Sequence, residues 1–130
     1  MCSSPEHPIY PYLLNWVKEN SENHDVSLVN SSNELDKGNF LFLISCTEIV
    51  KMNTREKFKH TLVIHESDLP KGRGWSPLIW ELLNGAKTIT ISLLEAVDKV
   101  DAGDIWKKTT IDVDDYETIN SISKKYCAAK

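Results

Sequence analysis

The chain has 130 residues, which is enough for a single domain with one modest core spanning residues 1–130. It is 41% hydrophobic and 26% charged, with a formal net charge of −4 and no long block of one sign. This charge disfavours nucleic acid as a partner, because phosphate binding usually requires a clustered basic face. No apolar stretch has the length of a membrane span, and the first residues lack the pattern of a signal peptide.

Hydrophobic periodicity predicts helices and strands in alternation. Residues 9–20 have helical spacing, with Pro11 acceptable in a first turn. The runs at 25–29 and 40–46 are predicted strands, and the second, apolar throughout, is expected to be covered on both faces. The further predicted elements are a helix at 53–60, a strand at 61–64, a helix at 76–85, strands at 88–94 and 104–111, and a helix at 116–128. We therefore expect a Rossmann-like, three-layer α/β domain with a mainly parallel sheet and helices on both faces.

The ends of the predicted strands carry the candidate functional residues, since ligands of parallel sheets collect at the carboxyl ends of strands. His65 directly follows the strand at 61–64, and Asp101 lies in the loop before the strand at 104–111. A histidine at a strand end is often only structural. Here it opens a loop in which Ser67 can bond the backbone and two glycines within 71–74 allow sharp turns, so a catalytic role is a hypothesis worth testing.

Other chemistries fit the sequence less well. The segment at His65 lacks the second histidine of a zinc-binding HExxH helix, and the three cysteines show no CxxC spacing, so no metal site is predicted. A G-x-S-x-G elbow for a serine hydrolase is absent from the chain. The odd number of widely separated cysteines favours a reducing compartment, and we expect a cytoplasmic protein.

The stretch "IHESDLPKGRGWSPLIWELLNG" combines His65 and Ser67 with a Leu-Pro pair, an Arg-Gly turn and a predicted helix that ends in Asn-Gly. It resembles the folate-dependent formyltransferase family, whose pattern is His-x-Ser-x-Leu-Pro-x-x-Arg-Gly-x-x-Pro, and the resemblance covers residues 62–107. The later stretch "ITISLLEAVDKVDAGDI" is similar to its strand and Asp-x-Gly loop. Asp101 follows His65 by 36 positions, the separation that the family's catalytic pair leads us to expect.

The resemblance implies transfer of a formyl group from the co-substrate 10-formyltetrahydrofolate to an amine, without a metal. His65 would stabilise the oxyanion or move the proton, Asp101 would fix the imidazole tautomer, and Ser67 is a candidate hydrogen-bond donor. The folate is expected against eight residues: Ile44, Ser45, Cys46, Thr47, Leu69, Pro70, Val97 and Asp98. The acceptor is expected against Arg73, Gly74 and Trp75, with Arg73 either binding phosphate or anchoring the loop.

The sequence departs from the family pattern in two ways. Val63 occupies the position, two residues before His65, where the family usually has an asparagine that donates to the oxyanion. Loss of one such donor typically costs about 10² to 10³ in rate. We also expect the domain to be shortened at both ends, without the usual first strand and part of the acceptor segment. The sheet edge left by a missing strand would favour a homo-oligomer.

Several functions stay open on this basis. The leading expectation is a small-molecule acceptor, a nucleotide-linked amino sugar. Formylation of methionyl-tRNA is an alternative, although it usually brings a basic RNA-contacting domain. Hydrolysis of the same folate donor needs only water in place of the amine, and a truncated, non-catalytic copy of the fold is the remaining possibility.

Overall fold

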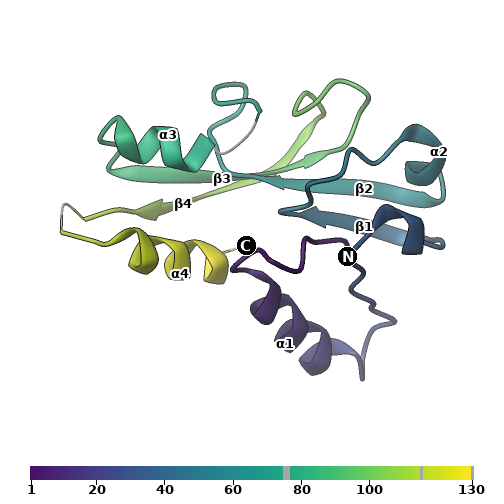
Figure 1. Cartoon of the computed structure of the whole chain (residues 1–130). Helices are drawn as coiled ribbons and strands as arrows, with labels where there is room; N and C mark the ends of the chain where they lie inside the picture. Colours follow the sequence, from purple (N-terminus) through teal and green to yellow (C-terminus); the bar gives the residue numbers. More distant parts are fainter. Residues whose placement is uncertain (75–76, 115, 130) are drawn as a thin grey trace. The chain divides into compact units, whose positions relative to one another are not determined.

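The computed structural model describes residues 1–74, 77–114 and 116–129 and has a mixed α/β fold (Figure 1). Its four strands are ordered β1-β2-β3-β4. The chain divides into two compact units, Met1–Leu62 and Val63–Lys130, and β2 continues from the first into the second. This arrangement confirms the α/β class. The single-domain organisation stays a prediction, and each unit is described by itself.

The first unit contains α1 (Tyr10–Asn20), the 3₁₀ turn η1 (Ser32–Glu34), β1 (Gly38–Ile44), α2 (Met52–Arg55) and the start of β2 (Phe58–His65). The helix predicted at 9–20 is confirmed, with a proline in its first turn. A capping box between Ser31 and Glu34 begins η1. The helix predicted at 53–60 is only one turn long, because the chain is extended again from Phe58.

Two predictions for the first unit are wrong. The strand expected at 25–29 is reduced to a single parallel bridge between Val29 and Cys2. Cys2 also forms an isolated parallel bridge with Leu43 of β1. The run at 40–46 is not covered on both faces throughout, since Phe40 is 49% exposed while Leu41 is buried. Phe40 instead stacks on its neighbours Phe42 and His60.

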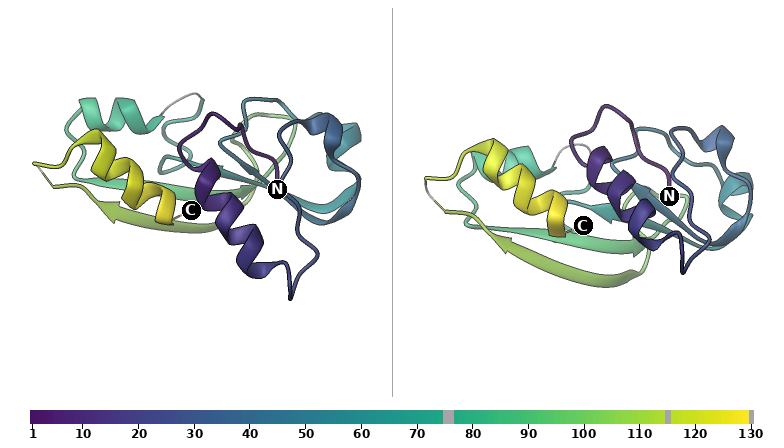
Figure 2. Two further views of the ribbon diagram at one scale, coloured as in Figure 1. Left: turned by 60° about the horizontal axis from the view of Figure 1, so that its bottom comes forward. Right: turned by 90° about the horizontal axis from the view of Figure 1, so that it is seen from below.

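The second unit contains the end of β2, α3 (Pro77–Leu83), β3 (Thr88–Glu95), β4 (Ile105–Asp112) and α4 (Ile119–Ala129). β3 and β4 lie side by side in every view and are antiparallel, in a register that pairs Thr88 with Asp112 (Figures 1 and 2). This pair departs from the mainly parallel sheet that we expected. Gly85, at φ 78°, follows α3, and Ser76, the first residue of the helix predicted at 76–85, lies outside the described residues.

Alternating side chains on β3 supply the core of the second unit. Ile89, Ile91 and Leu94 are buried, and α4 adds Ile122 and Tyr126. β4 pairs with β3 at the end of the strand order, and most of its side chains are exposed. Within the described part of the chain, no helix combines the length and apolar character needed to cross a membrane.

Candidate active site

His65 is the last residue of β2 and is only 8% exposed. Its Nε2–H donates to the carbonyl oxygen of Gly72, with 2.8 Å between the heavy atoms. Its other ring nitrogen, Nδ1, lies 3.6 Å from Oδ1 of Asp101, and the two side chains are 10% and 8% exposed. The structure thus brings together the two residues that the sequence analysis singled out. Because Gly72 can only accept, the ring must carry a proton on Nε2.

Asp101 is held in the β3–β4 loop by its own backbone and by the loop that follows β2. Its φ is +52°, a left-handed conformation uncommon for a residue other than glycine. Its Oδ2 accepts a hydrogen bond of 3.0 Å from the Gly74 N–H, and its carbonyl oxygen accepts one of 3.0 Å from Arg73 Nε. Arg73 therefore makes the loop-anchoring contact that was one of its two predicted roles. These bonds fix the carboxylate in the position facing His65.

The β3–β4 loop can close in this way only because position 103 is a glycine. A Cβ atom added to Gly103 would lie 1.8 Å from the carbonyl oxygen of Glu95, well inside van der Waals contact. The two ends of the loop are joined next to this glycine, where the Glu95 N–H donates to the carbonyl oxygen of Asp104 at 2.9 Å. The Asp-x-Gly pattern thus has a steric reason, since the glycine lets the loop return directly to β4.

Ser67 is fully buried, and its hydrogen bonds hold the His65 loop together and join it to β3. Its hydroxyl donates to the carbonyl oxygen of Lys71 at 2.8 Å, and its own carbonyl accepts from the buried Ser92 hydroxyl at 2.7 Å. Gly72, at φ 67°, packs against it so closely that an added Cβ would lie 2.8 Å from the Ser67 Cβ. These contacts give the loop one compact conformation.

Lys108 of β4 also holds this loop, a role that the sequence analysis missed. Its ammonium group donates to Asp68 Oδ1 at 2.6 Å and to the carbonyl oxygen of Leu69 at 2.7 Å. The hydrogen bond from Lys108 holds the pKa of Asp68 below its usual value. Burial raises the pKa of nearby Glu81, an effect reinforced by the charge of Asp68 and opposed by that of His65. The sequence gives no specific signal for this contact, because it shows only that Lys108 lies on a polar strand.

The remaining predicted residues are distributed over both units. In the first unit, Ile44 is buried at the end of β1, Ser45 has φ +48°, Cys46 is half-buried and Thr47 is exposed. In the second unit, Leu69 is buried, whereas Pro70, Val97 and Asp98 are exposed. Val63 is half-buried on β2, and Trp75 lies outside the described residues.

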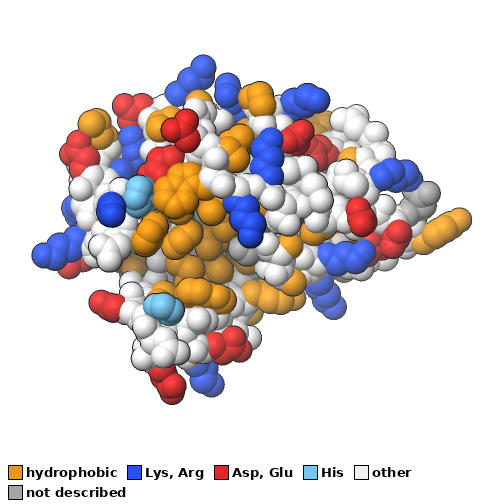
Figure 3. Space-filling view, turned by 180° about the vertical axis from the view of Figure 1, so that it is seen from behind, with side chains coloured by type: hydrophobic (Ala, Val, Ile, Leu, Met, Phe, Trp, Pro, Cys, Tyr) orange, Lys and Arg blue, Asp and Glu red, His pale blue; other side chains and the backbone are white. Residues whose placement is uncertain are grey.

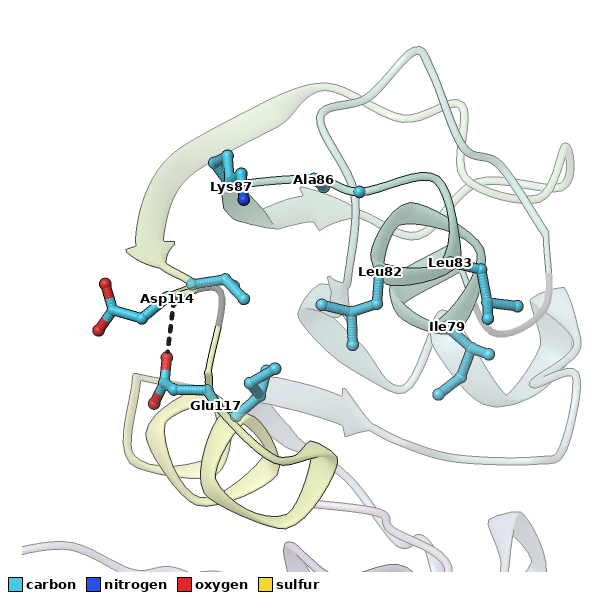
Figure 4. Close-up of a pocket in the computed structure, with 10 residues that line it drawn as sticks. Ile79, Leu82, Leu83, Ala86, Lys87, Asp114 and Glu117 are labelled. Atoms are coloured by element: carbon cyan, nitrogen blue, oxygen red, sulfur yellow. Dashed lines mark hydrogen bonds between the residues drawn. The ribbon is translucent and has the colours of Figure 1, made fainter.

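A groove of about 290 Å³ lies elsewhere in the second unit (Figure 4). Apolar side chains of α3, among them Ile79 and Leu82, line it together with Ile122 of α4. At its polar end the Asp114 N–H donates to the Glu117 carboxylate at 3.1 Å. Neither His65 nor Asp101 contributes to this groove, so it is separate from the candidate site. Among the described residues, no three histidine, cysteine or acidic side chains gather as metal ligands would.

The fold and the buried pair define an α/β protein with a histidine–carboxylate site. The family model described as formyl transferase matches residues 11–129, and the chain therefore belongs to this family. The bifunctional polymyxin resistance protein ArnA of Wigglesworthia glossinidia brevipalpis is 42% identical over 66 residues, which are 51% of this chain and 10% of that protein. The chain thus spans only a small part of this relative.

Solved structures show the same fold. The methionyl-tRNA formyltransferase of Clostridium thermocellum matches with a TM-score of 0.75 at 24% identity, over 85% of this chain and 52% of that one. The sugar 3N-formyltransferase WlaRD matches with a TM-score of 0.63 at 22% identity, over 90% of this chain and 41% of that one. These likenesses confirm the formyltransferase-like α/β fold that the sequence predicts.

Proposed function

We propose that the chain transfers a formyl group from 10-formyltetrahydrofolate to the amine of a small acceptor. The observation that carries this proposal is the buried contact between His65 and Asp101, set at a strand end in a chain of the formyl transferase family. In the reaction, the amine nitrogen bonds to the formyl carbon and the bond from that carbon to N10 of the folate breaks. The amine loses one proton and N10 gains one, giving a formamide and tetrahydrofolate.

His65 would supply the hydrogen bond to the oxyanion that forms during this attack. When the ring is protonated, both nitrogens donate, Nδ1–H towards Asp101 and Nε2–H towards Gly72. In the free chain the Gly72 carbonyl oxygen accepts the hydrogen bond from Nε2–H. We propose that the formyl oxygen of the bound donor takes its place as the acceptor. Catalytic hydrogen bonds commonly rearrange in this way between the free and the substrate-bound enzyme. Asp101 would hold the imidazole ring in the orientation that this step needs.

The oxyanion needs a second hydrogen-bond donor, because the side chain of Val63 has no N–H or O–H group. Ser67 already donates to the Lys71 carbonyl and is fully buried, so we assign it to positioning the loop rather than to the oxyanion. A main-chain N–H of the His65 loop is the group we propose in its place. A single backbone donor of this kind can be worth about 3 kcal/mol in a transition state, enough to offset a missing asparagine.

The folate would bind the strand-end segments named from the sequence. In the first unit these are Ile44 to Thr47, and in the second the Leu69-Pro70 pair and Val97-Asp98. Apolar side chains such as Ile44 suit the faces of a pterin ring, and main-chain groups suit its polar edge. The similar WlaRD structure was determined in the presence of dTDP and 5-N-formyl-tetrahydrofolate, which supports a folate donor for this chain as well.

For the acceptor we propose a nucleotide-linked amino sugar, with Arg73, Gly74 and Trp75 as the contacting residues. Arg73 is exposed and uses Nε on Asp101, which leaves its terminal nitrogens as candidates for phosphate. Methionyl-tRNA is the second candidate, since relatives include methionyl-tRNA formyltransferases. The net charge of −4 and the mixture of acidic and basic side chains over the face in Figure 3 favour the small acceptor. A cytoplasmic location is part of this proposal.

A turnover assay with 10-formyltetrahydrofolate tests the proposal and its alternatives together. The purified chain is incubated with the donor alone, with dTDP- and UDP-linked amino sugars, and with methionyl-tRNA, and each product is identified by mass spectrometry. We expect a mass gain of one formyl group on an amino sugar. Formate release without any acceptor would identify a hydrolase instead. No loss of donor in any arm, with a folded protein, would identify a non-catalytic member of the family.

A further inference from the structure

Two cysteines of the first unit, 44 positions apart in the sequence, are in contact. The Sγ atoms of Cys2 and Cys46 lie 3.7 Å apart, within thiol hydrogen-bond distance. Neither cysteine is in a disulfide. Closing this contact to a disulfide would bring the sulfurs to about 2.05 Å, a movement that small rotations of the two side chains can supply.

Pairing of the backbone holds both thiols in place. The Cys2 N–H donates to the Phe42 carbonyl at 2.9 Å, and the Ile44 N–H donates to the Cys2 carbonyl at 3.0 Å, so residues 1–3 are fixed alongside β1. After β1 the chain turns back at Ser45, whose φ is +48°. The turn is closed by the Thr47 N–H, which donates to the Ser4 hydroxyl at 3.2 Å. The contact between the two sulfurs is therefore built into the fold of this unit.

The two thiols differ in acidity and in exposure. The hydrogen bond from the Cys2 thiol lowers the pKa of Cys46 to about 7, against the opposing effects of partial burial and of the Glu48 carboxylate. The same contact, together with burial, raises the pKa of Cys2, while the Met1 ammonium group opposes that rise. Cys46 is half-buried, whereas Cys2 is fully buried. Such a pair consists of a more exposed cysteine that reacts with oxidants as its thiolate and a neighbouring thiol that resolves the product.

We propose that Cys2 and Cys46 form a reversible redox site, in which a peroxide oxidises the pair to an intramolecular disulfide. The Cys46 thiolate attacks one peroxide oxygen, the O–O bond breaks and a sulfenic acid forms. The hydroxide that leaves takes up the proton that the Cys46 thiol released, giving one water. Cys2 then loses its proton and bonds to the Cys46 sulfur, which releases a second water. Two thiols are oxidised by two electrons, and the peroxide is reduced. A thiol reductant reverses the step by exchange.

This inference concerns the first unit and does not depend on the proposed transfer activity. The disulfide would tie the first residues of the chain covalently to the turn after β1, to which Ser4 is now joined by hydrogen bonds. The remaining cysteine, Cys127, is buried on α4 and serves as an internal reference.

The test treats the full chain with a small excess of hydrogen peroxide, traps free thiols by alkylation and determines the mass of the intact protein and of its peptides. We expect the loss of two hydrogen atoms, a cross-linked peptide pair containing Cys2 and Cys46, and full recovery of both thiols on reduction. Oxidation of Cys46 to a sulfinic acid with Cys2 still free, a disulfide that involves Cys127, or three unreacted thiols would each overturn the proposal.

Two variants sharpen this test, with circular dichroism as the check that each is folded. Cys127→Ser should form the disulfide as the original chain does. Cys2→Ala should form none, and alkylation of its Cys46 should reach half of its maximal rate at a higher pH, because alanine has no hydrogen-bond donor to replace the thiol that lowers the pKa of Cys46. An unchanged alkylation profile in Cys2→Ala would show that the two thiols do not interact in solution, and would also overturn the proposal.

Discussion

Asp101 uses its two carboxylate oxygens for different partners, with Oδ1 facing His65 Nδ1 at 3.6 Å and Oδ2 accepting the Gly74 N–H at 3.0 Å. The residue thus connects the imidazole to the glycine turn that follows it. This arrangement separates two roles that mutation can test one at a time, because an asparagine can keep the bond to Gly74 while it loses the charge that faces His65.

Asp101→Asn should therefore fold normally and transfer formyl groups poorly. We expect kcat to fall by about 10² to 10⁴, the usual range for loss of acid–base assistance, with little change in folate affinity. Steady-state kinetics and a folate titration check this. Asp104→Asn, in the same loop and exposed, is the matched control and should keep its rate. Equal losses in both variants would indicate that general loop disruption, and not the charge of Asp101, is responsible.

Gly103→Ala should be strongly destabilising, since its new Cβ would meet the Glu95 carbonyl oxygen at 1.8 Å. We expect a loss of about 3 kcal/mol in the free energy of unfolding, at the upper end for overpacking, measured by urea denaturation. Gly85→Ala provides the comparison, because this glycine has a positive φ of 78° with open space around it. It should lose only about 1 kcal/mol. A Gly103→Ala variant as stable as the original chain would contradict the steric account of the Asp-x-Gly loop.

Lys108→Met should loosen the His65 loop with only a small effect on stability. The ion pair with Asp68 is exposed to solvent, at 35% and 56% of the two side chains, so its removal should change the free energy of unfolding little. The lost bond to the Leu69 carbonyl should nevertheless lower kcat several-fold, because the loop positions His65. Lys107→Met on the same strand is the control. Identical kcat values in the two variants would show that Lys108 does not help to position the His65 loop.

The contact between Glu117 and Lys125 should make the chain sensitive to acid. Hydrogen bonds from Lys125, the Asp114 N–H and Ser121 lower the pKa of Glu117 from 4.5 to about 2. A pKa lowered in the folded state means that this stabilisation is complete above about pH 4.5 and is lost as the pH falls towards 2. In Lys125→Met the difference in unfolding free energy between pH 5 and pH 2.5 should therefore shrink. Lys124→Met should show the same pH dependence as the original chain, and a matching curve for Lys125→Met would argue against the contact.

The sequence predicted most of the elements and the two residues of the central pair, for physical reasons that the structure makes clear. Strong periodicity located α1, β3 and α4 to within a few residues. The strand expected at 25–29 failed because its pairing depends on residues 1–3, a distant segment with no strand-like length of its own. The residue pattern within 25–29 cannot predict a pairing that depends on a partner so far away in the sequence.

The supporting contacts of the site were harder to foresee than the pair itself. The segment containing His65 and the Asp-x-Gly pattern has recognisable spacing, and Gly103 has a steric reason that a sequence can suggest. The contact of Lys108 with Asp68 and the Leu69 carbonyl depends on the register of β4 against β3. Likewise, the approach of Cys2 to Cys46 depends on the turn at Ser45, and the hydrophobic periodicity of the sequence does not predict this turn.

A calorimetric titration of the folded chain with 5-formyltetrahydrofolate, a stable analogue of the donor, tests the central claim most directly. The account predicts one site with a micromolar dissociation constant, a binding free energy of about 8 kcal/mol, that persists in Asp101→Asn. The absence of binding heat from a folded sample, at several temperatures to exclude a vanishing enthalpy, would contradict the claim that this chain is a folate-dependent formyltransferase.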